Sequence, residues 1–301
     1  MLNASMVQTG QPNEFLPDSG ISLRALAWSH GHVHVPPRHD APILSSPTVV
    51  LLHGLGDGAD IWRPMMASWK IPLTVIAFDL PGHGRSPWLV PTGYHVSRLA
   101  DLVAEALAQH GIVRPVLVGH SLGARIAVEL AARAALNPLG TILVDMSGHD
   151  SRETSRAVAA HVDAFMAGAP TLEGLVRLVG DRLPLADPQA VAMAVPAMAT
   201  SAEGRWRMAR DPAIKHLLAP SRHPEEIWSL LARLQGPAAI VRGAYSAVMD
   251  RRMAVRIAEA IPWRPVVIET VDKAGHAIPL EQPVVLARAI EKSLRGWRVA
   301  A

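Results

Sequence analysis

Six short apolar runs, each rich in β-branched residues, recur along the chain and are separated by segments with apolar residues at helical spacing. None of the runs alternates between apolar and polar residues, so each is typical of a strand covered on both faces. We predict strands at 48–53, 74–79, 115–119, 141–145, 238–243 and 266–271. We predict helices at 96–109, 122–135, 251–260 and 284–297.

Repeated strand-then-helix order predicts an α/β fold with a doubly wound, mostly parallel sheet. One gap interrupts this order, because no convincing strand occurs from about residue 147 to 235. We interpret that stretch as an inserted helical cap, with core parts at 1–146 and 236–301, and expect it to roof a pocket. Near the start, 21–28 and 32–35 can pair as a lead-in hairpin.

Composition excludes several classes of protein. Hydrophobic residues make up 50% of the chain, charged residues make up 18%, and the formal net charge is +3 with no dense Lys/Arg run, so we expect no nucleic-acid partner. No apolar stretch reaches the roughly 18 residues of a membrane span, and the first residues do not resemble a signal peptide. We therefore expect a cytoplasmic protein. The chain has no cysteine, which excludes thiolate chemistry and cysteine-based metal sites.

The sequence Gly119-His120-Ser121-Leu122-Gly123 follows one predicted strand and begins a predicted helix. This is the strand–turn–helix context of a nucleophile elbow, in which a tight turn exposes a serine hydroxyl. Glycines on either side let strand and helix approach closely. The helix N-terminus offers unpaired N–H groups where an oxyanion would develop. We predict that Ser121 is a nucleophile.

A serine hydroxyl needs a base, and His276 is the best candidate because it directly follows the last predicted strand. His53, His83 and His120 lie within motif loops, and we expect them to orient backbone groups. A further four histidines cluster between His30 and His39. Because no acidic pair accompanies this cluster, we favour a solvated hairpin over a metal site there.

With these motifs, residues 20–300 resemble the α/β-hydrolase superfamily, close to its capped esterase and lactonase branches. His53-Gly54-Leu55-Gly56 is similar to the family's H-G-x-G loop, and residues 79–86 match its D-x-P-G-x-G-x-S turn. The elbow and Gly275-His276 match as well. The resemblance implies that the backbone N–H groups of Leu55 and Leu122 form an oxyanion hole.

The sequence departs from many relatives at the triad acid. The family pattern R-G-x-x-S-D reads Arg242-Gly243-Ala244-Tyr245-Ser246-Ala247 here, with alanine in place of the carboxylate. Asp145 is one substitute, because it ends the strand after the elbow helix, where some relatives carry their acid. Asp250 is a second, although it can also cap the helix at 251–260. The third possibility is that no acid works.

These residues predict a serine hydrolase that cleaves a small or medium ester or lactone without a metal or cofactor. Trp62 and Met166 are our candidates for substrate contacts. Serine at the elbow argues against epoxide hydrolase or dehalogenase chemistry, for which the family uses aspartate. Carbon–carbon bond hydrolysis or perhydrolysis by the same triad is an alternative, and so is a non-catalytic ligand-binding protein, which the alanine at 247 supports. The sequence gives no indication of the oligomeric state.

Overall fold

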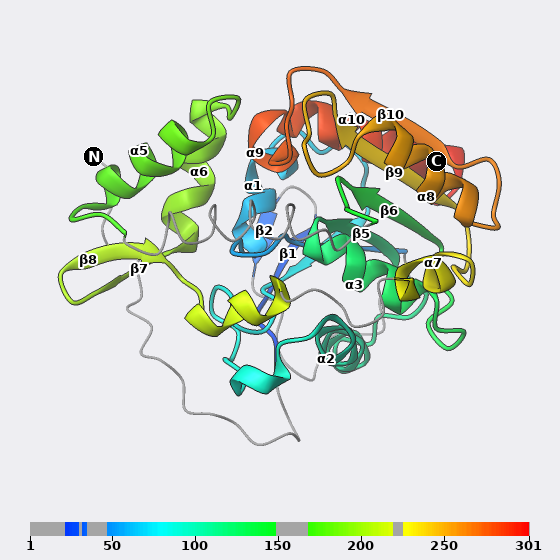
Figure 1. Cartoon of the computed structure of the whole chain (residues 1–301), viewed down its shortest axis with the longest axis horizontal. Helices are drawn as coiled ribbons and strands as arrows, with labels where there is room; N and C mark the ends of the chain where they lie inside the picture. The colour runs from blue at the N-terminus through cyan, green and yellow to red at the C-terminus, as the bar shows by residue number, and fades with distance from the viewer. Residues whose placement is uncertain (1–21, 30–31, 35–46, 149–167, 219–224, 301) are drawn as a thin grey trace.

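The computed structural model of the chain describes residues 22–29, 32–34, 47–148, 168–218 and 225–300. Its main sheet has eight strands in the order β10-β9-β6-β5-β3-β4-β1-β2 (Figure 1). The strands are β1 (Ala25–Ser29), β2 (His32–His34), β3 (Thr48–Leu52), β4 (Thr74–Phe78), β5 (Val116–His120), β6 (Gly140–Val144), β9 (Ala238–Gly243) and β10 (Val267–Val271).

The sheet is mostly parallel, as the sequence predicts. The six strands from β3 onward in this sheet run parallel to their neighbours, whereas β1 pairs antiparallel with both β4 and β2. The expected lead-in hairpin is therefore present as β1 and β2. All residues of β3, β5, β6 and β9 are buried, which explains their continuous apolar sequences.

Helices cover both faces of the sheet, and successive residues of β3 show how. Val50 and Leu52 pack into one hydrophobic cluster, and Val49 and Leu51 pack into another on the opposite face. The first cluster contains residues of α2 (Val96–Gln109), α3 (Leu122–Ala131), α7 (Glu226–Leu231) and α8 (Arg251–Ala260). The second contains residues of α1 (Arg63–Met66), α5 (Leu172–Arg182), α6 (Pro188–Met198), α9 (Ile278–Glu281) and α10 (Pro283–Gly296). The fold is doubly wound.

The stretch between β6 and β9 is less uniform than expected. It contains α5 and α6, but it also holds a two-stranded antiparallel sheet of β7 (Ala199–Ala202) and β8 (Arg205–Met208). The expectation of no strand here is wrong. Glu203 and Gly204 both have positive φ, as a two-residue hairpin turn requires. Figure 1 shows these elements on one side of the main sheet, away from α7 and α8.

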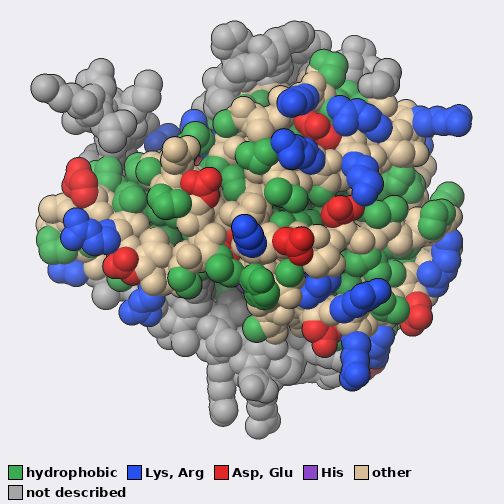
Figure 2. Space-filling view, turned by 90° about the horizontal axis from the view of Figure 1, so that it is seen from above, with side chains coloured by type: hydrophobic (Ala, Val, Ile, Leu, Met, Phe, Trp, Pro, Cys, Tyr) green, Lys and Arg blue, Asp and Glu red, His purple; other side chains and the backbone are tan. Residues whose placement is uncertain are grey.

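Helix α7 lies inside the range expected for the cap, yet it packs against α3 and α8 beside the main sheet. A 3-10 segment, η4 (Pro212–Leu218), precedes it, and η2 (Ala59–Trp62) and η3 (Pro91–Gly93) lie in earlier loops. No helix of the described residues is long and apolar enough to cross a membrane. Figure 2 shows a face on which Lys and Arg side chains are interspersed with Asp and Glu.

Candidate active site

Ser121 lies in a sharp turn between β5 and α3, with φ +52° and ψ −113°. A non-glycine residue in such a conformation stores strain of about 1–3 kcal/mol. The two flanking glycines make the turn possible. A Cβ atom on Gly119 would lie 2.2 Å from the carbonyl oxygen of Gly123, and one on Gly123 would lie 2.1 Å from that of Leu52. Helix α3 therefore lies close against β5 and the end of β3, and the chain turns sharply at Ser121 between them.

The hydroxyl of Ser121 lies beside the ring of His276, although 155 residues separate them in the sequence. His276 Nε2 is 3.0 Å from Ser121 Oγ, and His276 Nδ1 is 2.7 Å from Asp145 Oδ2. The Asp145 carboxylate is fully buried, and the His276 side chain is 30% exposed. The structure thus brings together the three residues in the order acid, imidazole and hydroxyl.

Asp145 is the first residue after β6 and accepts three hydrogen bonds. Besides His276, the Gly243 N–H donates to Oδ1 at 3.0 Å and the Ser246 hydroxyl donates to Oδ2 at 2.5 Å. Three donors fix the orientation of the carboxylate. Ser246 was not among the residues singled out from the sequence. Its position in the R-G-x-x-S part of the family pattern is the signal that could have identified it.

Asp250 does not contact His276. Its side chain accepts a hydrogen bond from the Met253 N–H at 2.7 Å and caps the N-terminus of α8, where it is exposed. Of the two carboxylates considered from the sequence, only Asp145 touches the imidazole.

The turn that carries His276 is held by Glu281. The Gly275 N–H donates to Glu281 Oε2 at 2.7 Å, and the Glu281 side chain is itself buried. Burial raises the pKa of Glu281 above its usual value, although the hydrogen bond from Gly275 and the proximity of His276 oppose that shift. Glu281 was also missed from the sequence, because it follows His276 by five residues in a stretch without a motif.

Two buried histidines hold the H-G-x-G loop in place, as expected from the sequence. His53 Nε2 accepts a hydrogen bond from the Leu80 N–H at 2.9 Å, and His83 Nε2 accepts one from the Gly56 N–H at 3.0 Å. Burial lowers the pKa of both rings, so both stay neutral and keep an acceptor nitrogen. They therefore act on the backbone of the loop.

The carboxylate of Asp79 organises the turn that follows β4. It accepts hydrogen bonds from the N–H groups of Ala59 at 2.7 Å and Arg85 at 2.9 Å, and from the Arg24 guanidinium at 3.0 Å. The Ser86 hydroxyl donates to the Asp79 carbonyl at 2.6 Å. These contacts connect the start of β1, the D-x-P-G-x-G-x-S turn and the loop before η2. The residues of this turn therefore support the site and do not line the cavity.

A cavity of about 240 Å³ opens beside Ser121 and His276. Its polar walls also include Asp57, His120 and Glu281, none of which the sequence had assigned to a pocket. The other lining residues are Gly54, Leu55, Ile61, Leu183, Ala247, Val248, Ala277, Pro279 and Leu280. Leu183, at the end of α5, belongs to the stretch between β6 and β9, so that stretch contributes to the pocket wall.

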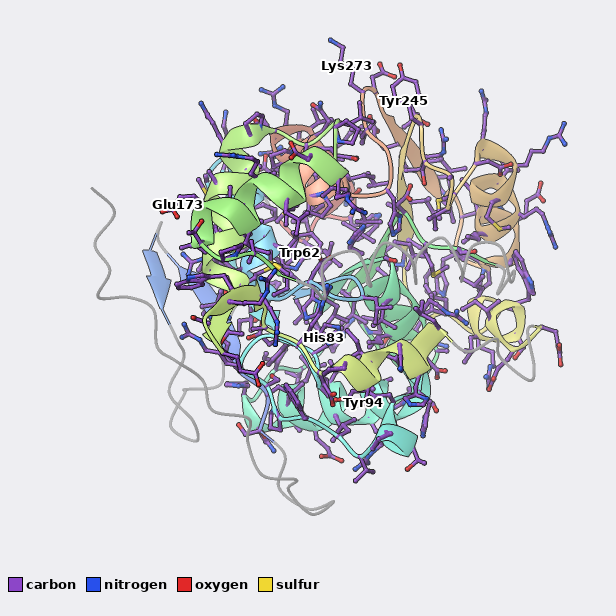
Figure 3. All side chains as sticks on the ribbon, turned by 60° about the vertical axis from the view of Figure 1, so that its left-hand side comes forward. Trp62, His83, Tyr94, Glu173, Tyr245 and Lys273 are labelled. Carbon is purple, nitrogen blue, oxygen red and sulfur yellow. The ribbon has the colours of Figure 1, made fainter. Side chains whose placement is uncertain are left out.

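Trp62 does not line this cavity. Its side chain is fully buried in the core between the sheet and its covering helices, and Figure 3 shows it inside the molecule. The structure therefore does not support Trp62 as a substrate contact. The Met and Trp residues of the chain suggested an apolar pocket that Trp62 could line, but its ring packs inward. Met166 lies outside the described residues.

The His30–His39 cluster lies mostly outside the described residues, except for His32 and His34 in β2. Among the residues that the structure describes, no group of three or more His, Asp and Glu side chains is arranged to hold a metal ion.

A model of the alpha/beta hydrolase family matches residues 49–289. RutD of Enterobacter cloacae is 39% identical over 90 residues, which are 30% of this chain and 34% of that protein. RutD of Escherichia coli is 34% identical over 113 residues, which are 38% of this chain and 40% of that protein. RutD carries the provisional name carbamate hydrolase. The match spans only about a third of these curated relatives.

Solved structures share the fold over nearly the whole chain. Crystallised E-2-(acetamidomethylene)succinate hydrolase has a TM-score of 0.75 at 23% identity, covering 83% of this chain and 92% of that one. A Mycobacterium tuberculosis esterase has a TM-score of 0.73 at 23% identity, covering 95% and 93%. An enol-lactonase from Burkholderia xenovorans has a TM-score of 0.64 at 20% identity, covering 91% and 96%. With the family model matching most of its length, this chain belongs to the alpha/beta hydrolase family.

Proposed function

We propose that this protein is a serine hydrolase that cleaves a small or medium carboxylic ester or lactone through an acyl-enzyme. The observation that carries the proposal is the unbroken contact from Asp145 through His276 to Ser121 at the mouth of a cavity. Names given to the relatives refer to ester, lactone or carbamate bonds. Each of those bonds has a carbonyl carbon that a serine hydroxyl can attack.

In the proposed reaction, Ser121 Oγ attacks the substrate carbonyl while His276 Nε2 takes the hydroxyl proton. Asp145 keeps the Nδ1–H tautomer and stabilises the imidazolium that forms, without itself being protonated. His276 then protonates the leaving alcohol. In the second half His276 removes a proton from water as the water oxygen attacks the acyl carbonyl, and it returns that proton to Ser121 Oγ when the acyl–Ser121 bond breaks and the acid leaves.

The developing oxyanion needs hydrogen-bond donors, and we assign this role to the backbone N–H groups of Leu55 and Leu122. Leu122 is the first residue of α3, and Leu55 lines the cavity. Within the described part of the chain, neither N–H has a backbone acceptor. Each donor supplies on the order of 3 kcal/mol of transition-state stabilisation in comparable sites.

The size and chemistry of the cavity favour a compact substrate. About 240 Å³ is below the usual 300–1,000 Å³ of pockets for drug-sized ligands, and most of the lining residues are apolar. We propose that the stretch between β6 and β9 acts as a cap, because Leu183 contributes to the pocket wall. Such a cover excludes water from the reacting groups and strengthens electrostatic interactions between them.

The non-catalytic alternative loses its main support. It depended on the alanine at position 247, but Asp145 supplies a carboxylate to His276 from the neighbouring strand. Carbon–carbon bond hydrolysis and perhydrolysis use the same triad, and no specific contact in the cavity favours either of them over ester or lactone hydrolysis.

The test is hydrolysis of p-nitrophenyl acetate, p-nitrophenyl butyrate and a small lactone by the purified protein. We expect turnover with an initial burst of one nitrophenol per protein. Ser121→Ala should lower kcat by at least about 10⁴-fold. Ser293→Ala is the matched control, because that hydroxyl donates to the Ala289 carbonyl within α10 and does not line the cavity. Equal turnover by wild type and Ser121→Ala would overturn the proposal.

A further inference from the structure

His120 precedes the nucleophile, lines the cavity and carries a buried acceptor atom. Its Nε2 lies 2.8 Å from the backbone carbonyl oxygen of His276, which can only accept, so this nitrogen carries the ring proton. Nδ1 of the neutral ring is then an acceptor. It is buried and has no hydrogen-bond partner among the residues that the structure describes. Leaving a buried acceptor unpaired costs about 1–3 kcal/mol, so a donor is expected to occupy the adjacent space.

A second acceptor lies next to the first. Asp57 Oδ2 is 3.8 Å from His120 Nδ1, which is too far for a hydrogen bond, and both residues line the cavity. A Cβ atom on Gly54 would lie 2.9 Å from both atoms, so they converge on one point of the cavity wall. When Asp57 is ionised, both atoms are acceptors, so neither can donate a hydrogen bond to the other.

Burial is the main cause of the pKa shifts of Asp57 and His120. Burial raises the pKa of Asp57 to about 7, against the opposing effects of Arg210 and His276. Burial and the proximity of His276 lower the pKa of His120 to about 3, so its ring stays neutral. Above pH 7 both atoms are therefore acceptors. Below pH 7 the Asp57 carboxyl is protonated and loses the negative charge that strengthens a hydrogen bond from a donor.

We propose that Asp57 Oδ2 and His120 Nδ1 form an acceptor pair that binds a hydrogen-bond donor of the substrate, a hydroxyl or N–H group close to the scissile carbonyl. The inference rests on the proposed hydrolase function and names its substrate class, esters or lactones with a hydroxyl, amine or amide substituent. Within the described residues, no Lys or Arg side chain lines the cavity, whereas Asp57 and Glu281 both do. Because these two carboxyl groups line the cavity without a cationic side chain beside them in the lining, substrates with an anionic acyl group are disfavoured.

The experiment compares kcat/KM for methyl butyrate with those for methyl 2-hydroxybutyrate and methyl 3-hydroxybutyrate, at pH 8 in a pH-stat. The wild type should prefer one hydroxy ester by on the order of 10-fold or more, because a hydrogen bond to an ionised acceptor is stronger than most. Asp57→Leu keeps the branched shape of the side chain but removes the acceptor, and the ratio should fall to about one. Asp250→Asn, which changes an exposed acid outside the cavity, should leave the ratio unaltered.

A second measurement requires no variant. The wild-type preference should rise as pH increases through about 7, because Asp57 then gains the negative charge that strengthens a hydrogen bond from the substrate donor. Ionisation of His276 affects all three esters equally and cancels in the ratio. Of the other charged groups near Asp57, Arg210 lowers the pKa of Asp57, and Glu281, which also lines the cavity, accepts a hydrogen bond from the Gly275 N–H.

A wild-type ratio near one at every pH would overturn the inference, and so would an unchanged ratio in folded Asp57→Leu protein. Either result would mean that water alone occupies the acceptor pair. Methyl butyrate separates this failure from a failure of the proposed function. If the apolar ester is hydrolysed but no preference exists, only the acceptor pair is rejected. If none of the esters is hydrolysed and Ser121 shows no burst, both proposals are rejected.

Discussion

The loops that follow β6 and β9 lie side by side but contribute different groups to the same site. Val144 pairs with Val241 in the parallel ladder, so both strands end at one edge of the sheet. The β6 end supplies the buried carboxylate of Asp145. The β9 end supplies only donors to it, from the Gly243 N–H and the Ser246 hydroxyl.

In this chain the carboxylate that contacts His276 lies at the end of β6 and not in the neighbouring β9 loop, although both strand ends lie at the same edge of the sheet. His276 approaches from the loop after β10, on the far side of β9, and its Nδ1 reaches past the β9 end to the carboxylate at β6. The serine of the R-G-x-x-S pattern remains useful because it binds the relocated acid. Ala247 faces the cavity, where a small side chain leaves room for substrate.

Asp145→Asn should give the largest effect. An amide cannot hold the Nδ1–H tautomer in the same way, and comparable changes lower kcat by about 10⁴-fold. Steady-state kinetics on p-nitrophenyl butyrate measures the loss, and thermal unfolding checks that the variant is folded. Unchanged kcat in a folded variant would break the comparison, because β6 would then not carry the acid.

The double variant Asp145→Asn with Ala247→Asp moves the carboxylate to the β9 loop. Because both strand ends lie beside His276, we expect recovery of about 10- to 100-fold in kcat relative to Asp145→Asn alone, on a scale where a tenfold change is 1.36 kcal/mol. The same kinetic assay applies. If the folded double variant shows no recovery, the two strand ends are not interchangeable positions for the acid.

Ser246→Ala should have an intermediate effect. It removes one of three hydrogen bonds to Asp145, each worth about 1.5–3 kcal/mol when the acceptor is charged. We expect kcat to fall by about 10-fold with little change in KM, together with a lower thermal unfolding midpoint. The Ser293→Ala variant is again the matched control. A change confined to KM would place Ser246 in substrate binding instead.

Asp250→Asn should have the smallest effect. Asn is as good an N-cap as Asp, so we expect a stability change within about 0.5 kcal/mol and activity within about twofold of the wild type. Chemical denaturation and the ester assay measure both. A loss of activity comparable to that of Asp145→Asn would mean that Asp250 reaches the imidazole during turnover.

Much of this architecture could be predicted from the sequence because its signals are local. Buried strands such as β3 and β6 appear as uninterrupted apolar runs, and the turn around Ser121 requires its flanking glycines. The choice between Asp145 and Asp250 stayed open, since it depends on how two loops bend in space. The same holds for Asp57 and His120, whose shared role appears only when the H-G-x-G loop folds against the elbow.

Two predictions from the sequence were wrong, those for the β7–β8 hairpin and for Trp62. The β7–β8 hairpin was missed because Glu203–Gly204 is a weak turn signal between strands with little β-branched character. Trp62 was predicted to contact substrate because the Met and Trp residues suggested an apolar pocket, but its ring is fully buried. Figure 3 shows the exposed side chains of Tyr245, in the loop after β9, and Lys273, in the loop after β10.

The most direct test of the account is covalent labelling of the purified protein with a fluorophosphonate, followed by peptide mapping. We predict one adduct per chain, on Ser121, formed much more slowly in folded Asp145→Asn protein because His276 is then a poorer base. The account would be contradicted by an adduct on another residue, by no adduct in folded wild-type protein, or by equal labelling rates in the two proteins.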